Sequence, residues 1–139
     1  MNILSIKNLT LSIDDKVILD RVNFKINEGD LFGLIGESGS GKSITASAVI
    51  GLPPDNSTLS GEIFLGNQDL LKNTEVQMTK VRGNQISFIF QEPMTALNPL
   101  KTIQEQVAET LLIHSDLSKK AAHNIAIMKL NRVGINTNI

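Results

Sequence analysis

The chain has 139 residues, of which 41% are hydrophobic and 19% charged, a composition typical of a soluble globular domain. Its 13 basic and 14 acidic side chains give a formal net charge of -1, which excludes an overall positive field, so we expect no nucleic-acid partner. Cysteine is absent, which excludes a disulfide scaffold and a cysteine nucleophile, and with only two histidines we expect no structural zinc site.

The apolar runs are short, and even residues 86–90 stay far below the roughly 18 to 20 residues of a membrane-spanning helix. The first residues show no charged leader followed by a long apolar stretch and a cleavage site. We therefore expect a cytoplasmic protein.

Alternating apolar residues predict extended strands in the first part of the chain. These strands cover residues 3–6, 9–13, 17–19 and 22–26, with a turn at Asp14 and Asp15. The nearly continuous apolar run at 31–35 predicts a central strand that is buried on both faces of a sheet.

Beyond residue 42, helical spacing alternates with strand patterns. The predicted elements are a helix over 43–52 stopped by Pro53 and Pro54, a strand over 60–66, a helix over 75–81, a second buried strand over 86–90 and a loop over 93–99. A capping box at Thr102 and Glu105 predicts a helix carrying Ile103, Val107 and Leu111 on one face. A last helix begins at Ser118, buries Ala122, Ile125, Ala126 and Val133, and ends at Gly134.

One motif carries chemistry. Gly36, Glu37, Ser38, Gly39, Ser40, Gly41, Lys42 and Ser43 match G-x-x-x-x-G-K-[ST], the phosphate-binding loop. Glycines let the backbone wrap closely around phosphates, and the helix that follows adds the positive end of its dipole. Lys42 supplies a full positive charge, and the Ser43 hydroxyl is a hard oxygen ligand suited to Mg²⁺. The pattern therefore predicts a nucleotide site.

The competing interpretation is a flexible glycine-rich linker that matches the motif by chance. The position of the motif between a buried-type strand and an amphipathic helix favours the nucleotide site. The motif alone leaves kinases, GTPases, motor ATPases and transporter ATPases open. A soluble kinase would want a cluster of lid arginines, and the chain has only Arg21, Arg82 and Arg132.

Further residues make the pattern specific. Residues 20–26, 28–30, 34–43, 59–63 and 81–99 resemble the corresponding parts of an ABC-transporter ATP-binding subunit. The last of these segments is similar to the Q-loop region of the subgroup that energises import of peptides, dipeptides and nickel, and in particular to the ATPases of microcin C and oligopeptide uptake systems. The resemblance covers essentially the whole chain.

The resemblance implies an α/β P-loop NTPase fold of the ABC type. It divides the chain into an antiparallel β-subdomain at 1–30, a core with the phosphate loop and Q-loop at 31–92, and the start of a helical subdomain at 93–139. It implies ATP and Mg²⁺ as ligands, with residues Gly36 to Ser43 on the phosphates. Gln91 becomes the Q-loop glutamine that touches Mg²⁺ and the attacking water. Residues 92–99 become the place that receives the permease.

The resemblance also implies partners and a location. An ABC importer contains transmembrane permease subunits and a second ATP-binding subunit, and its ATPases lie in the cytoplasm on the inner face of the membrane. The two histidines, His114 and His123, have no carboxylate or second histidine at ligand spacing, so we interpret both as surface residues.

The sequence departs from the family pattern in two ways. Ile13 stands where the family usually stacks an aromatic side chain on adenine, so the stacking contact is lost. The sequence also contains no L-S-G-G-Q signature, Walker B strand or switch histidine, and so lacks the glutamate that polarises water.

We therefore expect the N-terminal part of such an ATPase, from a truncated gene, a pseudogene or a deliberately shortened protein. Such a chain binds nucleotide without turning it over, and it exposes unpaired sheet edges and apolar surface. The alternative function is a catalytically inactive nucleotide-binding or permease-docking fragment.

Overall fold

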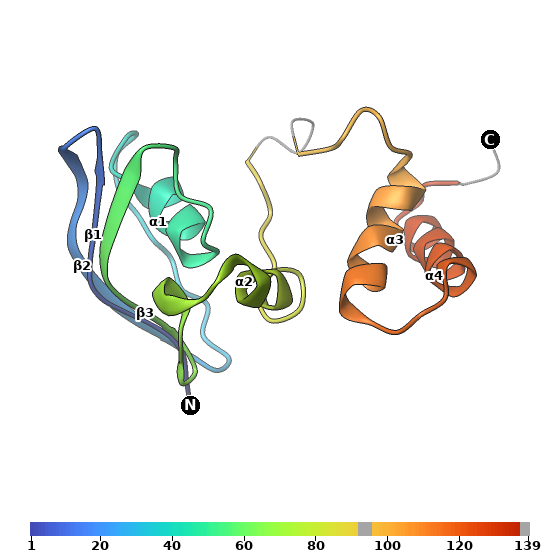
Figure 1. Ribbon diagram of the computed structural model, residues 1–139, viewed down its shortest axis with the longest axis horizontal. Helices are drawn as coiled ribbons and strands as arrows, with labels where there is room; N and C mark the ends of the chain where they lie inside the picture. The colour runs from blue at the N-terminus through green and yellow to red at the C-terminus, as the bar shows by residue number, and fades with distance from the viewer. Residues whose placement is uncertain (92–95, 137–139) are drawn as a thin grey trace. The chain divides into compact units, whose positions relative to one another are not determined.

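The structure is a computed structural model that describes residues 1–91 and 96–136. The chain forms two compact units, Met1–Val81 and Arg82–Ile139 (Figure 1). Within the described residues, no helix combines the length and the apolar character needed to cross a membrane. The predicted loop at 93–99 falls partly outside the described residues, and its remainder from residue 96 onward contains neither helix nor strand.

The first unit is built on an antiparallel sheet. Its strands are β1 (Asn2–Ile13), β2 (Lys16–Asn27), β3 (Ser57–Leu65) and β4 (Gln68–Asp69), in the order β2-β1-β3-β4. Ile13 pairs with Lys16 across a tight turn, in which Asp14 and Asp15 both take positive φ angles of 45° and 65°. The predicted antiparallel β-subdomain is therefore confirmed, with its short strands joined into long ones.

The sheet curves around a helix, α1 (Lys42–Val49) (Figure 1). The predicted helix ran to residue 52, but α1 ends at Val49, and Gly51, with a φ of +67°, follows its C-cap residue Ile50. The Leu52 N–H donates to the Ser47 carbonyl at 2.9 Å and the Gly51 N–H to the Ala48 carbonyl at 3.0 Å, the pattern of a glycine C-cap.

A short 3₁₀ turn, η1 (Leu70–Lys72), and α2 (Glu75–Val81) complete the first unit, and α2 has the bounds that the sequence predicted. The buried apolar side chains of this unit come from the sheet and from the helices. They are Ile6, Leu9, Leu11, Leu19, Ala48, Val49, Ile50, Ile63, Leu70, Met78 and Val81. Aliphatic residues thus form this core, as expected of a chain with five phenylalanines and no other aromatic residue.

The two buried strands predicted at 31–35 and 86–90 are wrong. Neither segment is assigned as a strand, and Ile35 and Ile89 are 95% and 92% exposed. A strand of this type is buried only when neighbouring strands and helices cover it. Among the described residues, segment 31–35 pairs with no strand, and segment 86–90 makes an isolated bridge from Ile86 to Arg82 but joins no sheet. The accompanying expectation of exposed apolar surface is confirmed.

The second unit contains a helical hairpin of α3 (Ile103–His114) and α4 (Lys119–Arg132). Both predicted caps are present: Thr102 and Glu105 form a capping box, and the Ser118 hydroxyl accepts from the Ala121 N–H at 3.3 Å. The buried centre consists of alanines, which let the helices approach closely, with four larger side chains packed around them. These residues are Ala108, Ala122 and Ala126, with Val107, Leu111, Leu112 and Leu117 around them.

The end of α4 differs in one residue from the prediction. Gly134 takes a φ of +83° and terminates the helix as expected, with the Ile135 N–H donating to the Leu130 carbonyl at 3.0 Å. Val133, predicted to be buried, is 72% exposed, because it is the C-cap residue and no longer follows the helical face of Ala122 and Ala126.

Candidate phosphate-binding site

The phosphate loop connects an extended segment to the first turn of α1. Residues 31–37 belong to no helix or strand, a turn follows at Ser38 and Gly39, and the helix begins at Lys42. Gly41 is the N-cap residue and has a φ of +86°, a left-handed conformation that glycine adopts without strain. The predicted passage from the loop into the helix is thus confirmed, although the strand before it is not formed.

Lys42 folds back over the loop that precedes it. Its Nζ donates to the carbonyl oxygens of Gly36 at 2.8 Å and Glu37 at 2.5 Å, and to Ser40 Oγ at 3.2 Å. The ammonium group therefore lies inside the curve of the loop, surrounded by neutral oxygens. Since none of these partners is anionic, the positive charge is hydrogen-bonded without being neutralised.

Two glycines of the loop lie close to other side chains, which would have to shift if a Cβ were added. A Cβ on Gly36 would lie 2.6 Å from Ser40 Oγ, and a Cβ on Gly41 would lie 2.5 Å from Leu19 Cδ2 on β2. Gly39 differs, since its φ is +78° but nothing lies within 4 Å of an added Cβ. Glycine at 36 therefore avoids a contact with the Ser40 side chain, glycine at 39 allows the left-handed backbone, and glycine at 41 does both, next to Leu19.

The first turn of α1 supplies the other elements of the site. Gly41 has no side chain that could cap the helix, so the first N–H groups of α1 are left for a ligand. Ser43 is exposed in this turn, as a metal ligand must be. Thr45, which the sequence interpretation passed over, is buried, and its hydroxyl donates to the Gly41 carbonyl at 2.9 Å. The apolar helical pattern around it gave no signal of this role.

These residues fit a triphosphate and its metal ion. The loop combines backbone that approaches closely, an ammonium group that is not neutralised and an exposed hydroxyl at a helix N-terminus. The anionic oxygens of a triphosphate can accept hydrogen bonds from the loop backbone and from the ammonium group, and Mg²⁺ takes a hydroxyl oxygen as a ligand.

Gln91 and Ile13, two other residues of the sequence prediction, lie in different units. Gln91 is exposed in the irregular segment after residues 86–90 of the second unit, so it does not end a strand. Residues 92–95, predicted beside it to receive a permease, lie outside the described residues. Ile13 is half-buried at the end of β1, where it pairs with Lys16 and Ser57. The roles of Gln91 and Ile13 stay predictions.

The two histidines are half-buried on the helical hairpin. His123 Nδ1 lies 3.4 Å from Gln104 Nε2, and His114 Nε2 would lie 3.1 Å from a Cβ on Gly83. Each ring is therefore packed on one side and partly exposed, which is compatible with the interpretation of both as surface residues.

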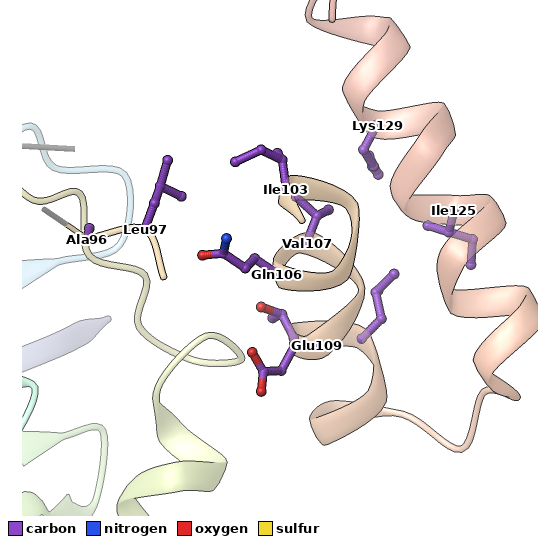
Figure 2. A pocket seen from close by; sticks show the side chains of 10 residues that line it. Ala96, Leu97, Ile103, Gln106, Val107, Glu109, Ile125 and Lys129 are labelled. Atoms are coloured by element: carbon purple, nitrogen blue, oxygen red, sulfur yellow. The ribbon is translucent and has the colours of Figure 1, made fainter. Parts of the chain in front are cut away.

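A hollow of 590 Å³ opens on the second unit, beside α3 (Figure 2). Ala96 and Leu97 from the preceding loop form one side of it, and α3 and α4 form the other. Its apolar lining includes Ile103, Val107 and Ile125, while Gln106, Glu109 and Lys129 supply polar groups. Ala96 and Leu97 belong to residues 92–99, the segment that the family resemblance implies as a permease contact.

Comparison with known proteins decides the family. The sequence profile of the ABC transporter family matches residues 19–138, which is most of the chain. The chain belongs to the ABC transporter family. Its P-loop NTPase fold of the ABC type is thereby confirmed for the part of the domain that the chain contains.

Relatives in this family are longer proteins. The chain is 46% identical over 118 residues to the oligopeptide transport ATP-binding protein AppD of Bacillus subtilis, a match covering 84% of the chain and 36% of AppD. It is 36% identical to the oligopeptide transport ATP-binding protein OppD of Escherichia coli, covering 94% of the chain and 40% of OppD. The chain thus spans well under half the length of these relatives.

A solved ABC structure shares the fold. It is the ATP-binding cassette MJ0796 in a dimeric, post-hydrolysis state bound to ADP and Pi. The two chains superpose with a TM-score of 0.77 at 28% sequence identity, over 94% of this chain and 57% of the other.

Proposed function

We propose that the chain is the ATP-binding part of an ABC importer subunit that couples ATP hydrolysis to uptake of peptides or similar small solutes. The observation that carries the proposal is Lys42, whose ammonium group lies inside the loop and, within residues 1–91 and 96–136, contacts neutral oxygens only. Phosphate oxygens carry negative charge and form stronger hydrogen bonds with an ammonium group than carbonyl oxygens do. ATP therefore displaces the carbonyl groups of Gly36 and Glu37 from Lys42.

Ser43 and Gln91 are the proposed Mg²⁺ ligands, Gln91 by resemblance to the family. The Ser43 hydroxyl is exposed in the first turn of α1 and provides a hard oxygen donor. The Gln91 amide oxygen is a second donor of the same kind, and by resemblance to the family Gln91 also orients the attacking water. When bound, Mg²⁺ neutralises charge that develops on the phosphates.

The cargo and partners are proposed from the relatives. AppD and OppD are oligopeptide transport proteins, so peptides are the proposed cargo of the complex. Permease subunits are the proposed membrane partners, and the dimeric state of MJ0796 supports a second ATP-binding subunit. The protein would then act in the cytoplasm, on the inner face of the membrane.

A second candidate function concerns the 139 residues by themselves. The sequence has no L-S-G-G-Q signature, and no glutamate of a Walker B strand to polarise water. On their own, these residues would bind nucleotide without hydrolysing it. The apolar groove beside α3 supports the related possibility of a permease-docking module.

Calorimetric titration with ATP and Mg²⁺ tests nucleotide binding. Lys42→Ala removes a charge-assisted contact of about 1.5 to 3 kcal/mol, so affinity should fall about ten- to a hundredfold. Lys16→Ala, which removes an exposed lysine from the start of β2, is the matched control and should bind ATP normally. Equal affinity of the two variants would contradict the nucleotide site.

A phosphate-release assay separates the two candidate functions. If the chain is part of an importer ATPase, a fusion of the 139 residues to the remaining sequence of a relative should release phosphate from ATP. If the chain is an inactive binding module, the 139 residues alone should bind ATP and release no phosphate. Sustained turnover by these residues that depends on Lys42 would reject the inactive module.

A further inference from the structure

A second pocket, with several polar side chains in its lining, lies on the sheet of the first unit. It has a volume of 330 Å³ and is lined by residues of β1, β2 and the β3-β4 region. Six of its side chains matter here: Asn2, Ser5, Lys7, Lys25, Phe64 and Asn67. None of them belongs to the phosphate loop, and the proposed function leaves this pocket without a role.

The strand register brings its central residues together. Ser5 on β1 pairs with Lys25 on β2 and with Phe64 on β3. Directly opposite residues in antiparallel strands place their side chains on the same face of the sheet. Ser5 therefore lies between a lysine and an aromatic ring, and Lys7 follows two residues later on the same face.

Ser5 is an unusual serine. It is only 3% exposed, and its Oγ has no hydrogen-bond partner among the described residues. Buried hydroxyl groups in folded proteins are hydrogen-bonded with few exceptions, and each exception calls for a missing partner. Because Ser5 lines the pocket, a ligand that moves the neighbouring side chains aside and reaches the buried hydroxyl is a candidate for that partner.

The charge around Ser5 is positive. Lys7 Nζ lies 3.3 Å from Glu62 Oε2 and 5.1 Å from the centre of the Phe64 ring, so its charge is already balanced. Lys25 is exposed and makes no ion pair within residues 1–91 and 96–136. One ammonium group is thus available beside the unpaired hydroxyl.

We propose that this pocket binds a small oxyanion, with Ser5 Oγ and the amide groups of Asn2 and Asn67 donating hydrogen bonds and Lys25 supplying charge. A hydroxyl and two amides are neutral donors, and phosphate or carboxylate oxygens accept hydrogen bonds from them equally well. A lysine recognises either anion as a point charge. Phosphate and carboxylate therefore share the chemistry, and the experiment distinguishes them.

Amide NMR of the whole 139-residue chain, titrated with inorganic phosphate, tests the site. Phosphate also reaches the loop at Gly36 to Ser43, but the two sites report through different amides. We expect saturable shifts at Ser5, Lys25 and Asn67. Acetate at equal ionic strength gives the carboxylate arm, and saturable shifts there show that the site accepts both anions. Sodium chloride giving the same shifts would overturn the proposal.

Two variants assign the contacts. Lys25→Gln should weaken phosphate binding at Ser5 about three- to tenfold, a modest loss because solvent screens an exposed charge. Lys16→Gln, on the same strand and outside the pocket, should leave the affinity unchanged. Equal affinities in these two variants would overturn the proposal.

Ser5→Ala separates a ligand contact from a purely structural role. Removing a buried hydroxyl without a partner should raise the melting temperature in chloride and abolish the phosphate shifts at the neighbouring amides. The control Ser12→Ala, on the same strand, should keep those shifts. A lower melting temperature of Ser5→Ala with phosphate binding intact would contradict the site.

Discussion

Asn8 on β1 and Asn23 on β2 hydrogen-bond to each other twice, although they are 15 residues apart. The Asn8 N–H donates to Asn23 Oδ1 at 2.9 Å, and Asn23 Nδ2 donates to Asn8 Oδ1 at 3.3 Å. Asn8 has a φ of +48°, and the register of β1 shifts here against both of its neighbours. The side-chain amides replace ladder hydrogen bonds at this bulge.

Asn23→Ala should therefore destabilise the first unit. The Asn8 N–H loses its acceptor, which costs about 1 kcal/mol at an exposed site. Urea denaturation measures the change in the free energy of unfolding. Lys16→Ala, an exposed change on the same strand, should stay within about 0.5 kcal/mol of the unchanged chain. If Asn23→Ala lowers the free energy of unfolding no more than this control does, the side-chain hydrogen bonds at the bulge do not stabilise the unit.

Gly61 on β3 faces the same bulge and should tolerate no side chain. Its φ is +104°, and an added Cβ would lie 2.5 Å from the Asn8 carbonyl oxygen, which is backbone and cannot rotate away. We expect Gly61→Ala to cost about 3 kcal/mol in the free energy of unfolding. Gly66→Ala is the matched control, because Gly66 has a φ of +58° and open space around it, and should cost about 1 kcal/mol. Similar losses in the two variants would contradict the close approach.

Two glycines of the phosphate loop form a second pair. Gly41→Ala places a Cβ 2.5 Å from Leu19 Cδ2 at a φ of +86°, whereas Gly39→Ala meets only the strain of a φ of +78°. The strain costs about 1 to 2 kcal/mol in either variant, and the contact with Leu19 adds to it at Gly41 alone. ATP affinity and the urea midpoint should both fall further for Gly41→Ala. If Gly39→Ala lowers the ATP affinity and the urea midpoint more than Gly41→Ala does, the contact between residue 41 and Leu19 on β2 is not maintained in solution.

The N-terminus of α3 should respond to acid. Hydrogen bonds from the Thr102 backbone N–H at 2.8 Å and the Thr102 hydroxyl at 2.9 Å lower the pKa of the Glu105 carboxyl from its ordinary value of 4.5. Because the folded pKa is depressed, Glu105 contributes stability above its unfolded pKa and loses it as the pH falls through the folded pKa.

The Thr102 amide resonance reports this change. It should shift as the pH is lowered below about 4.5, when the carboxylate takes up its proton. In Glu105→Gln the side chain still accepts a hydrogen bond but does not titrate, so the shift should vanish. A Thr102 amide that titrates identically in both proteins would assign the effect to another group.

Local signals in the sequence predicted local structure well. Thr102 with Glu105, Ser118 and Gly134 each mark a helix end through contacts within a few residues, and all three marks are confirmed. The glycines of the phosphate loop belong to the same class, because their conformation depends mainly on neighbouring residues. Gly51 is a signal of the same kind, but the helix end was predicted at the prolines that follow it and so was placed too late in the sequence.

Long-range structure could not be predicted from pattern. The apolar runs at 31–35 and 86–90 indicate a preference for burial, but burial requires strands and helices from elsewhere in the sequence. The bulge at Asn8 was equally hidden, since it depends on Asn23 and Gly61 on two other strands. Ser5 gives no signal in the sequence at all, because only the register places it beside Lys25.

Under the proposed function, the position of Lys42 makes nucleotide binding an exchange reaction. Its ammonium group already has three oxygen partners, so a ligand is bound by the difference between its own oxygens and those it displaces. A nucleoside without phosphates offers no oxygen better than a carbonyl group and leaves the loop closed on itself. Each added phosphate group would shift the competition further, so we expect the number of phosphates, more than the identity of the base, to determine which metabolites bind to the loop.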